Sequence, residues 1–123
     1  MPPLRRQPGQ ARAPHGVLGD RFGASCESRV LSRAFRYLGS SGYEAVRNRP
    51  YSGGYVLDRP ARPTRGIHAL QVEVCRSIYL DDRMDETSAG LNPLAQVLAG
   101  LVRELGAEMA RLSDGGHLDE AAE

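Results

Sequence analysis

Residues 48–82 read NRPYSGGYVLDRPARPTRGIHALQVEVCRSIYLDD, and this stretch decides the fold. Its second half, Ile67–Cys75, carries apolar residues on both alternating faces, which predicts a strand covered on both sides, as in α/β sheets. Its first half, Asn48–Gly66, is rich in Pro and Gly and predicts a loop of nineteen residues. Loops of that length in compact domains are usually functional. We therefore expect the functional residues to gather around this loop and strand.

Two helices are predicted on either side of this stretch. Apolar residues in 27–38 recur at helical spacing, with Ser25 as a candidate N-cap. A longer apolar stripe spans 94–112, and Asn92-Pro93 before it suggests an N-cap followed by Pro at the first helical position. The stripe contains Leu94, Val97, Leu98, Leu101, Val102, Leu105, Met109 and Leu112.

Short strands are predicted at Val17-Leu18 and at Tyr43–Arg47. The order strand, helix, strand, long loop, strand, helix predicts an α/β fold with a mixed or largely parallel sheet. These elements are too few to cover both faces of such a sheet, so we expect half of a domain. That half spans residues 16–112, between a disordered Arg- and Pro-rich arm at 1–15 and a flexible tail at 113–123.

Composition excludes several classes of function. The net charge of +1 offers no field that would attract nucleic acid or a membrane surface, and no apolar run is long enough to predict a membrane helix. Cys26 and Cys75 lie in no zinc-type spacing, and no secretory signal precedes them, which favours reduced thiols in the cytoplasm. We expect no nucleic-acid or membrane partner.

Glu73, in the middle of the predicted strand, is the leading candidate for chemistry. An unpartnered carboxylate buried in an apolar strand costs free energy. Glu73 is therefore a general base or the activator of a metal-bound water, or else it is a structural residue, paired with a nearby arginine or placed on a solvated edge of the sheet. The pattern does not choose between these roles. Arg21 and Arg76 suit the binding of a carboxylate, His68 is more typical of a hydrogen-bonded structural residue, and Asn48 and Tyr55 could line a pocket.

Three segments together resemble one family. They are GDRFGASC at 19–26, NRPYSGGY at 48–55 and RGIHALQVEVCRSIYLDD at 65–82. Over about residues 17–110 the chain resembles the C-terminal half of N-formylglutamate amidohydrolase. This enzyme hydrolyses N-formyl-L-glutamate to L-glutamate and formate in histidine catabolism.

The resemblance implies a partial three-layer α/β/α sandwich like that of the zinc-dependent exopeptidases, and an N-formyl amino acid with an acidic side chain as substrate. It makes Glu73 the catalytic base. It places Arg21, Asn48, Tyr55, His68 and Arg76 at positions that bind substrate or orient that base. Cys75 departs from the Asn that relatives usually have.

The resemblance also implies a divalent metal, zinc, at the carboxyl ends of the strands. Its ligands lie in family segments upstream of residue 19, for which we find no counterpart. His15, His68 and His117 are scattered, so we assign no metal ligand to this chain. Two hypotheses follow: a hydrolase of this family present as a truncated chain, or an inactive remnant that acts as a small binding or partner-dependent module. Both leave a homo-oligomer open.

Overall fold

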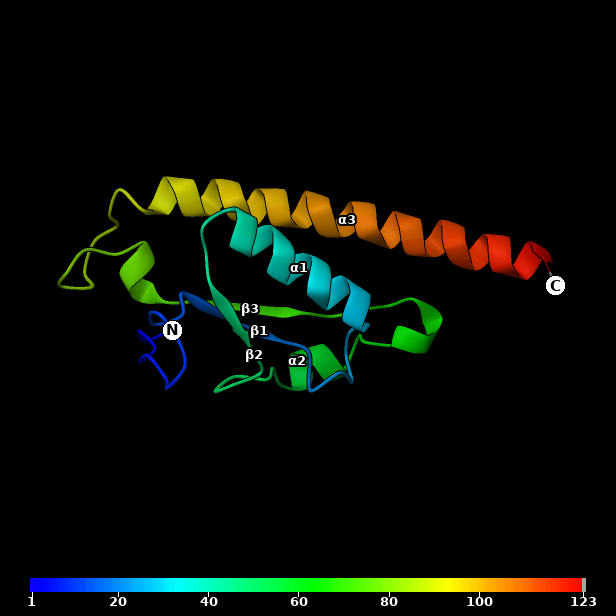
Figure 1. The fold of residues 1–123 in the computed structure, drawn as a ribbon, viewed down its shortest axis with the longest axis horizontal. Coiled ribbons are helices and arrows are strands. Elements are labelled where there is room, and N and C mark those ends of the chain that lie inside the picture. The colour runs from blue at the N-terminus through cyan, green and yellow to red at the C-terminus, as the bar shows by residue number, and fades with distance from the viewer. Residues whose placement is uncertain (123) are drawn as a thin grey trace.

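The computed structural model describes the backbone of residues 1–122 and the side chains of residues 1–113. It contains three strands, β1 (Gly16–Gly19), β2 (Ala45–Arg47) and β3 (Gln71–Val74). The α-helices are α1 (Ser28–Ser40), α2 (Tyr55–Asp58) and α3 (Leu91–Ala122), and short 3₁₀ helices cover Pro63–Arg65 and Arg76–Ile78. Figure 1 shows α1 and α3 together on one side of the sheet.

The sheet has the order β2-β1-β3 and is mixed. Strand β1 runs parallel to β2 and antiparallel to β3. The parallel pair is connected through α1, as expected for a crossover connection. The prediction of an α/β fold with a mixed sheet is confirmed.

The register assigns side chains to the two faces of the sheet. Val17 pairs with Val46 on one side and with Glu73 on the other, so these three residues form one row across the sheet on a single face. Leu18 pairs with Val72 and points to the opposite face, where it is fully buried against α1 and α3. Glu73 therefore lies on the face that α1 and α3 leave uncovered.

The core lies between the sheet and the two long helices. Its buried members are Leu18, Leu31, Ala34, Leu38 and Leu101. The three helical positions from α1 follow the spacing that predicted this helix. From the predicted stripe on α3, Leu101 is buried in this core and Val97 and Leu105 pack against it. Val102 of the same stripe is 73% exposed.

Three predicted boundaries are wrong. Strand β3 is only four residues long and lies at an edge of the sheet, and Val72 is 37% exposed, so this strand is not covered on both faces. The predicted loop after Asn48 contains α2 and a 3₁₀ helix. Helix α3 begins at Leu91, so Asn92 is not its N-cap. Pro93 is tolerated there because the first four N–H groups of a helix have no partner within the helix.

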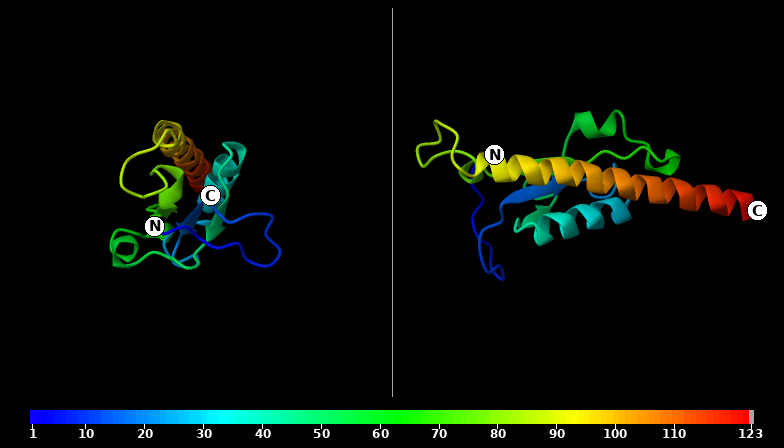
Figure 2. Two further views of the ribbon diagram at one scale, coloured as in Figure 1. Left: turned by 90° about the vertical axis from the view of Figure 1, so that its left-hand side faces the viewer. Right: turned by 90° about the horizontal axis from the view of Figure 1, so that it is seen from above.

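The two ends of the chain differ in how they contact the rest of the fold. Residues 1–15 hold no helix or strand, yet the Met1 ammonium donates a hydrogen bond to the Val74 carbonyl at 2.9 Å. The Arg76 N–H donates to the Met1 carbonyl at 2.8 Å. At the other end, α3 continues past Ser113, where the sequence predicted a flexible tail, and Figures 1 and 2 show it extending beyond α1. Within the described residues no helix is both long and apolar enough to cross a bilayer.

Candidate functional site

The carboxyl ends of the parallel strands β1 and β2 lead into two loops that are joined by side chains. Asp20 directly follows β1 and Asn48 directly follows β2. Asn48 Nδ2 donates to Asp20 Oδ1 at 2.7 Å, and the Asp20 N–H donates to Asn48 Oδ1 at 2.9 Å. Loops at the carboxyl ends of parallel strands are the usual location of ligand sites in α/β folds. Asn48 therefore lies where a binding residue is expected, but its own amide is already engaged with Asp20.

Asp20 is fully buried and remains charged through its partners. Burial raises its pKa, but the hydrogen bonds from Asn48 and Arg47, the Gly23 N–H and the charge of Arg47 outweigh that effect and leave the pKa below its ordinary value. Arg47 Nη2 lies 2.9 Å from Asp20 Oδ2, and the rest of the arginine is half exposed. The sequence interpretation missed both residues. The available signal was an acidic residue placed directly after an apolar strand end.

The backbone in the two loops is unusual. Arg21, Phe22 and Asn48 have φ between 53° and 60°, the left-handed region that is uncommon for residues other than glycine. Such conformations persist where surrounding contacts impose them, and they cluster at functional sites. One such contact is the Arg21 N–H, which donates to the Ser52 carbonyl at 2.9 Å. The two loops are thus tied by backbone as well as by side chains.

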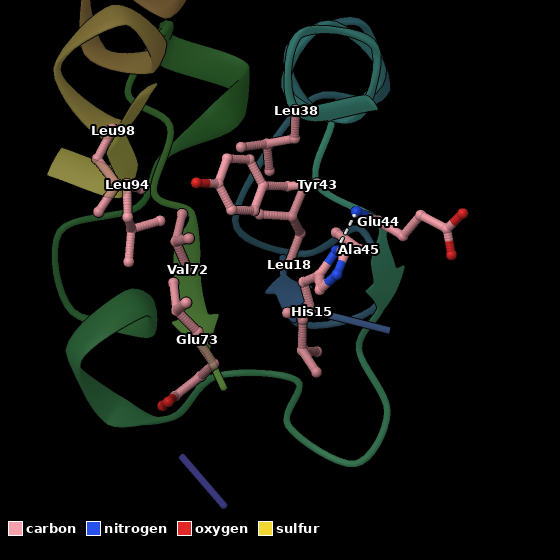
Figure 3. A pocket seen from close by; sticks show the side chains of 13 residues that line it. His15, Leu18, Leu38, Tyr43, Glu44, Ala45, Val72, Glu73, Leu94 and Leu98 are labelled. Atoms are coloured by element: carbon pink, nitrogen blue, oxygen red, sulfur yellow. Dashed lines mark hydrogen bonds between the residues drawn. The ribbon is translucent and has the colours of Figure 1, made fainter. Parts of the chain in front are cut away.

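The predicted base, Glu73, is half-buried in the middle of β3. Its carboxylate accepts a 3.3 Å hydrogen bond from Gln71 Nε2, and no ion pair to it is found among the described side chains. Of the two structural alternatives, the pairing with a nearby arginine finds no support in this geometry, whereas β3 does lie at an edge of the sheet. In Figure 3 the carboxylate turns away from Leu94 and Leu98, consistent with its place on the face of the sheet opposite the two long helices.

The apolar cavity drawn in Figure 3 is not a ligand site. It lies between the sheet and the two long helices and has a volume of about 20 Å³. Such a space holds about one water molecule. His15 lines it and is already engaged, because its Nδ1 accepts a hydrogen bond from the Glu44 N–H at 2.9 Å and its ring packs edge-on against Tyr43.

The other predicted binding residues are not brought together. Arg21 is paired with Asp58 (Nε–Oδ1, 3.0 Å), and Arg76 follows β3 at the end where Met1 binds. His68 Nδ1 accepts a hydrogen bond from the Glu27 N–H at 3.0 Å, which satisfies a free donor at the start of α1. Tyr55, the first residue of α2, is 71% exposed. The roles of these residues in binding stay predictions.

Among the described residues, no group of three His, Cys, Asp or Glu side chains lies close enough to hold a metal ion. The side chain of His117 lies outside the described part.

Cys26 is buried at the start of α1, and desolvation together with the charge of Asp20 raises the pKa of its thiol to about 11. That direction is opposite to the lowering expected at a helix N-terminus and leaves the thiol unreactive.

Comparisons with known proteins converge on one family. A model of the N-formylglutamate amidohydrolase family matches residues 1–80. An N-formylglutamate deformylase from Pseudomonas aeruginosa is 30% identical over 95 residues, which are 76% of this chain and 35% of that protein. A second, from Pseudomonas putida, is 31% identical over 72 residues, which are 58% of this chain and 27% of that one.

A solved structure agrees with the sequence matches. The crystal structure of N-formylglutamate amidohydrolase from Ralstonia eutropha JMP134 superposes with a TM-score of 0.62 at 29% identity, over 89% of this chain and 36% of that chain. The chain thus spans about a third of the length of the relatives it matches. The predicted resemblance is confirmed, with one correction: the family match includes the first fifteen residues, which the motifs had left out.

Proposed function

Because the chain belongs to the N-formylglutamate amidohydrolase family, we propose that it carries part of a site that hydrolyses N-formyl-L-glutamate to L-glutamate and formate. The observation that carries this proposal is the extent of the family match. Residues 1–80 include both loops joined by Asp20 and Asn48 and the whole of β3 with Glu73. The segments that relatives share with this chain are therefore the ones that form its candidate site.

Glu73 is the residue we assign to proton transfer. Hydrolysis of a formamide needs a base that takes a proton from the attacking water and returns it to the leaving amine. A half-buried carboxylate with one weak hydrogen bond and no ion pair among the described side chains is suited to that role. Because Glu73 lies within strand β3, its backbone is held in a fixed position by the sheet.

The divalent metal expected from the resemblance does not fit the described residues, because they gather no three ligands. His15 and His68 also use their Nδ1 atoms to bind backbone N–H groups of Glu44 and Glu27. We derive no step of the reaction through a metal. A cytoplasmic location remains part of the proposal.

A second candidate function is supported by the same geometry. The chain could act as a binding module that holds the acidic ligand without hydrolysing it. One observation favours it: the described side chains gather no three ligands for a metal ion.

Formate release from N-formyl-L-glutamate, measured with and without added Zn²⁺, separates the two candidates. Under the first, formate appears and Glu73→Gln lowers its rate by roughly 100-fold or more. The matched control is Glu86→Gln, an exposed loop carboxylate far along the chain from β3, which we expect to leave the rate unchanged. Ligand binding without formate under either condition favours the binding module.

A further inference from the structure

The N-terminal arm helps to enclose a large cavity near the candidate site. This cavity has a volume of about 930 Å³ and lies between the arm, the loop after β1 and the loop after β2. Its size is in the range of small-molecule sites. Asn48 and Ser52 line it, so it adjoins the joined loops described above. Among its apolar walls are Leu4 from the arm, Phe22 from the first loop and Val46 from β2.

The charged side chains that line this cavity are two arginines, Arg5 and Arg49, with no carboxylate beside them. Neither arginine takes part in an ion pair found among the described side chains. In a chain whose 16 basic residues nearly balance 15 acidic ones, this is a local excess of positive charge. A cavity with an apolar wall and two free guanidinium groups fits a small carboxylate.

Arg49 is also held in place. Its guanidinium carbon lies 5.5 Å from the centroid of the Phe22 ring, a cation–π geometry that restricts the side chain without neutralising it. Asn48, the preceding residue, is buried and bonded to Asp20. The backbone next to Arg49 is therefore anchored to the buried carboxylate at the end of β1.

The two arginines predicted to bind carboxylates do not line this cavity. Arg21 is paired with Asp58, and Arg76 lies beyond β3 at the end of the sheet where Met1 binds. The cavity instead opens over Val46, which shares its face and its row with Val17 and Glu73. Two strand spacings, about 10 Å, separate the Val46 and Glu73 backbones. A ligand in the cavity lies on the same face as the proposed base.

We propose that Arg5 and Arg49 bind the carboxylate groups of an acidic small molecule in this cavity, and that the N-terminal arm is thereby a wall of the binding site. The identity of the ligand as an N-formyl acidic amino acid rests on the proposed function. The positions of the two arginines do not. The proposal moves carboxylate recognition from Arg21 and Arg76 to residues that the sequence motifs had not singled out.

Titration calorimetry with glutarate, a dicarboxylate, and glutaramide, its neutral diamide, tests this inference on the intact chain. We expect glutarate to bind and glutaramide not to bind. Arg5→Gln and Arg49→Gln each weaken glutarate binding by roughly tenfold, the loss expected for one charge-assisted hydrogen bond. Arg49→Lys keeps the charge and recovers part of the loss. Arg36→Gln, an exposed arginine of α1 outside this cavity, leaves binding unchanged.

Thermal unfolding of each variant checks that weaker binding does not come from a lost fold. Arg5 is the cleaner variant for this purpose, because it is exposed and lies outside every helix and strand. A folded chain that binds no glutarate, or binds glutarate and glutaramide equally, overturns the inference. The inference is also overturned if both variants release formate with an unchanged KM for N-formyl-L-glutamate. That result leaves the proposed hydrolysis intact. Arginine-dependent binding of glutarate without formate release supports the inference and counts against the hydrolysis.

Discussion

Asn48 and Asp20 bind each other through two hydrogen bonds, although 28 positions separate them in the chain. The amide of Asn48 both donates to the Asp20 carboxylate and accepts from the Asp20 N–H. Both residues are almost completely buried. This pair fixes the loop after β1 to the loop after β2, and both loops line the cavity in which we place the ligand.

Replacing Asn48 with Ala should lower the free energy of unfolding by about 3 kcal/mol, since a buried carboxylate loses a charge-assisted partner. Ala also tolerates the φ of 60° at this position poorly. Asn48→Gly separates the two causes, because glycine keeps the backbone conformation and loses only the hydrogen bonds. Urea unfolding of the three proteins measures the difference. Equal stability of wild type and Asn48→Gly would show that the pair contributes nothing.

The charge of Asp20 makes stability depend on pH. Its pKa in the folded chain lies below the ordinary value of 3.8, so the unfolded chain binds more protons in the interval between the two values. The contribution of the ionised Asp20 carboxylate to the free energy of unfolding is therefore fully present above about pH 4. It is lost as the pH falls through the pKa of Asp20 in the folded chain. Urea titrations from pH 7 downward should show this loss. In Asp20→Asn the same titration should be flatter in that interval, and a parallel decline in both proteins would contradict the assignment.

Local patterns in the sequence were sufficient for the elements that depend on neighbours in the chain. The helical spacing of Val30, Leu31, Ala34 and Leu38 predicted the buried face of α1, and all four are buried. A helix face is set within a few turns, so its pattern is readable without knowledge of the fold. The order of the elements predicted a mixed or largely parallel sheet, and the sheet is mixed.

The candidate site could be predicted only in part, because its contacts join distant segments. Asn48 was expected to bind a ligand, but its partner Asp20 becomes apparent only once β1 and β2 are known to lie side by side. Arg5 was assigned to a disordered arm, and its place in the cavity depends on how that arm lies against the loops. His68 was expected to be structural, and its hydrogen bond to Glu27 is consistent with that expectation.

The close approach of β1 to the glycine-rich loop should make Gly19 intolerant of a side chain. A Cβ atom at Gly19 would lie 2.7 Å from the carbonyl carbon of Ser52 and 2.9 Å from its oxygen. Because these are backbone atoms, the loop itself must shift, and we expect Gly19→Ala to destabilise the fold by about 1–3 kcal/mol. Gly106→Ala on α3 is the matched control. Apart from its own helical turns, nothing lies within 4 Å of the new Cβ, so this variant should gain roughly 0.5–1 kcal/mol of stability.

Chemical denaturation of both variants gives the comparison. The shift of the loop should also weaken glutarate binding in Gly19→Ala, because Ser52 and Asn48 line the cavity. Unchanged stability of Gly19→Ala would mean that the loop after β2 is not packed against the end of β1.

Glu108 should act as an ionic contact between α3 and α1. Its side chain is 9% exposed, and its carboxylate lies 3.4 Å from Arg29 Nη2 of α1 and 2.8 Å from Arg111 Nη1 of α3. The hydrogen bond from Arg111, opposed by desolvation and aided by the charge of Arg29, holds the pKa of Glu108 below its ordinary value. Glu108→Gln removes the charge and leaves both arginines without their partner. We expect a lower midpoint of thermal unfolding in this variant.

Ionic strength distinguishes this contact from simple packing. Because salt screens charges near the surface, the gap in midpoint between wild type and Glu108→Gln should narrow as NaCl is raised from low concentration to 1 M. The gap should also narrow as pH falls through the folded pKa of Glu108, since the wild-type carboxylate then loses the same charge. Glu86→Gln, an exposed loop residue, should show no salt-dependent gap. A gap that stays constant with salt and pH would assign the effect of Glu108→Gln to packing of α3 on α1 and not to charge.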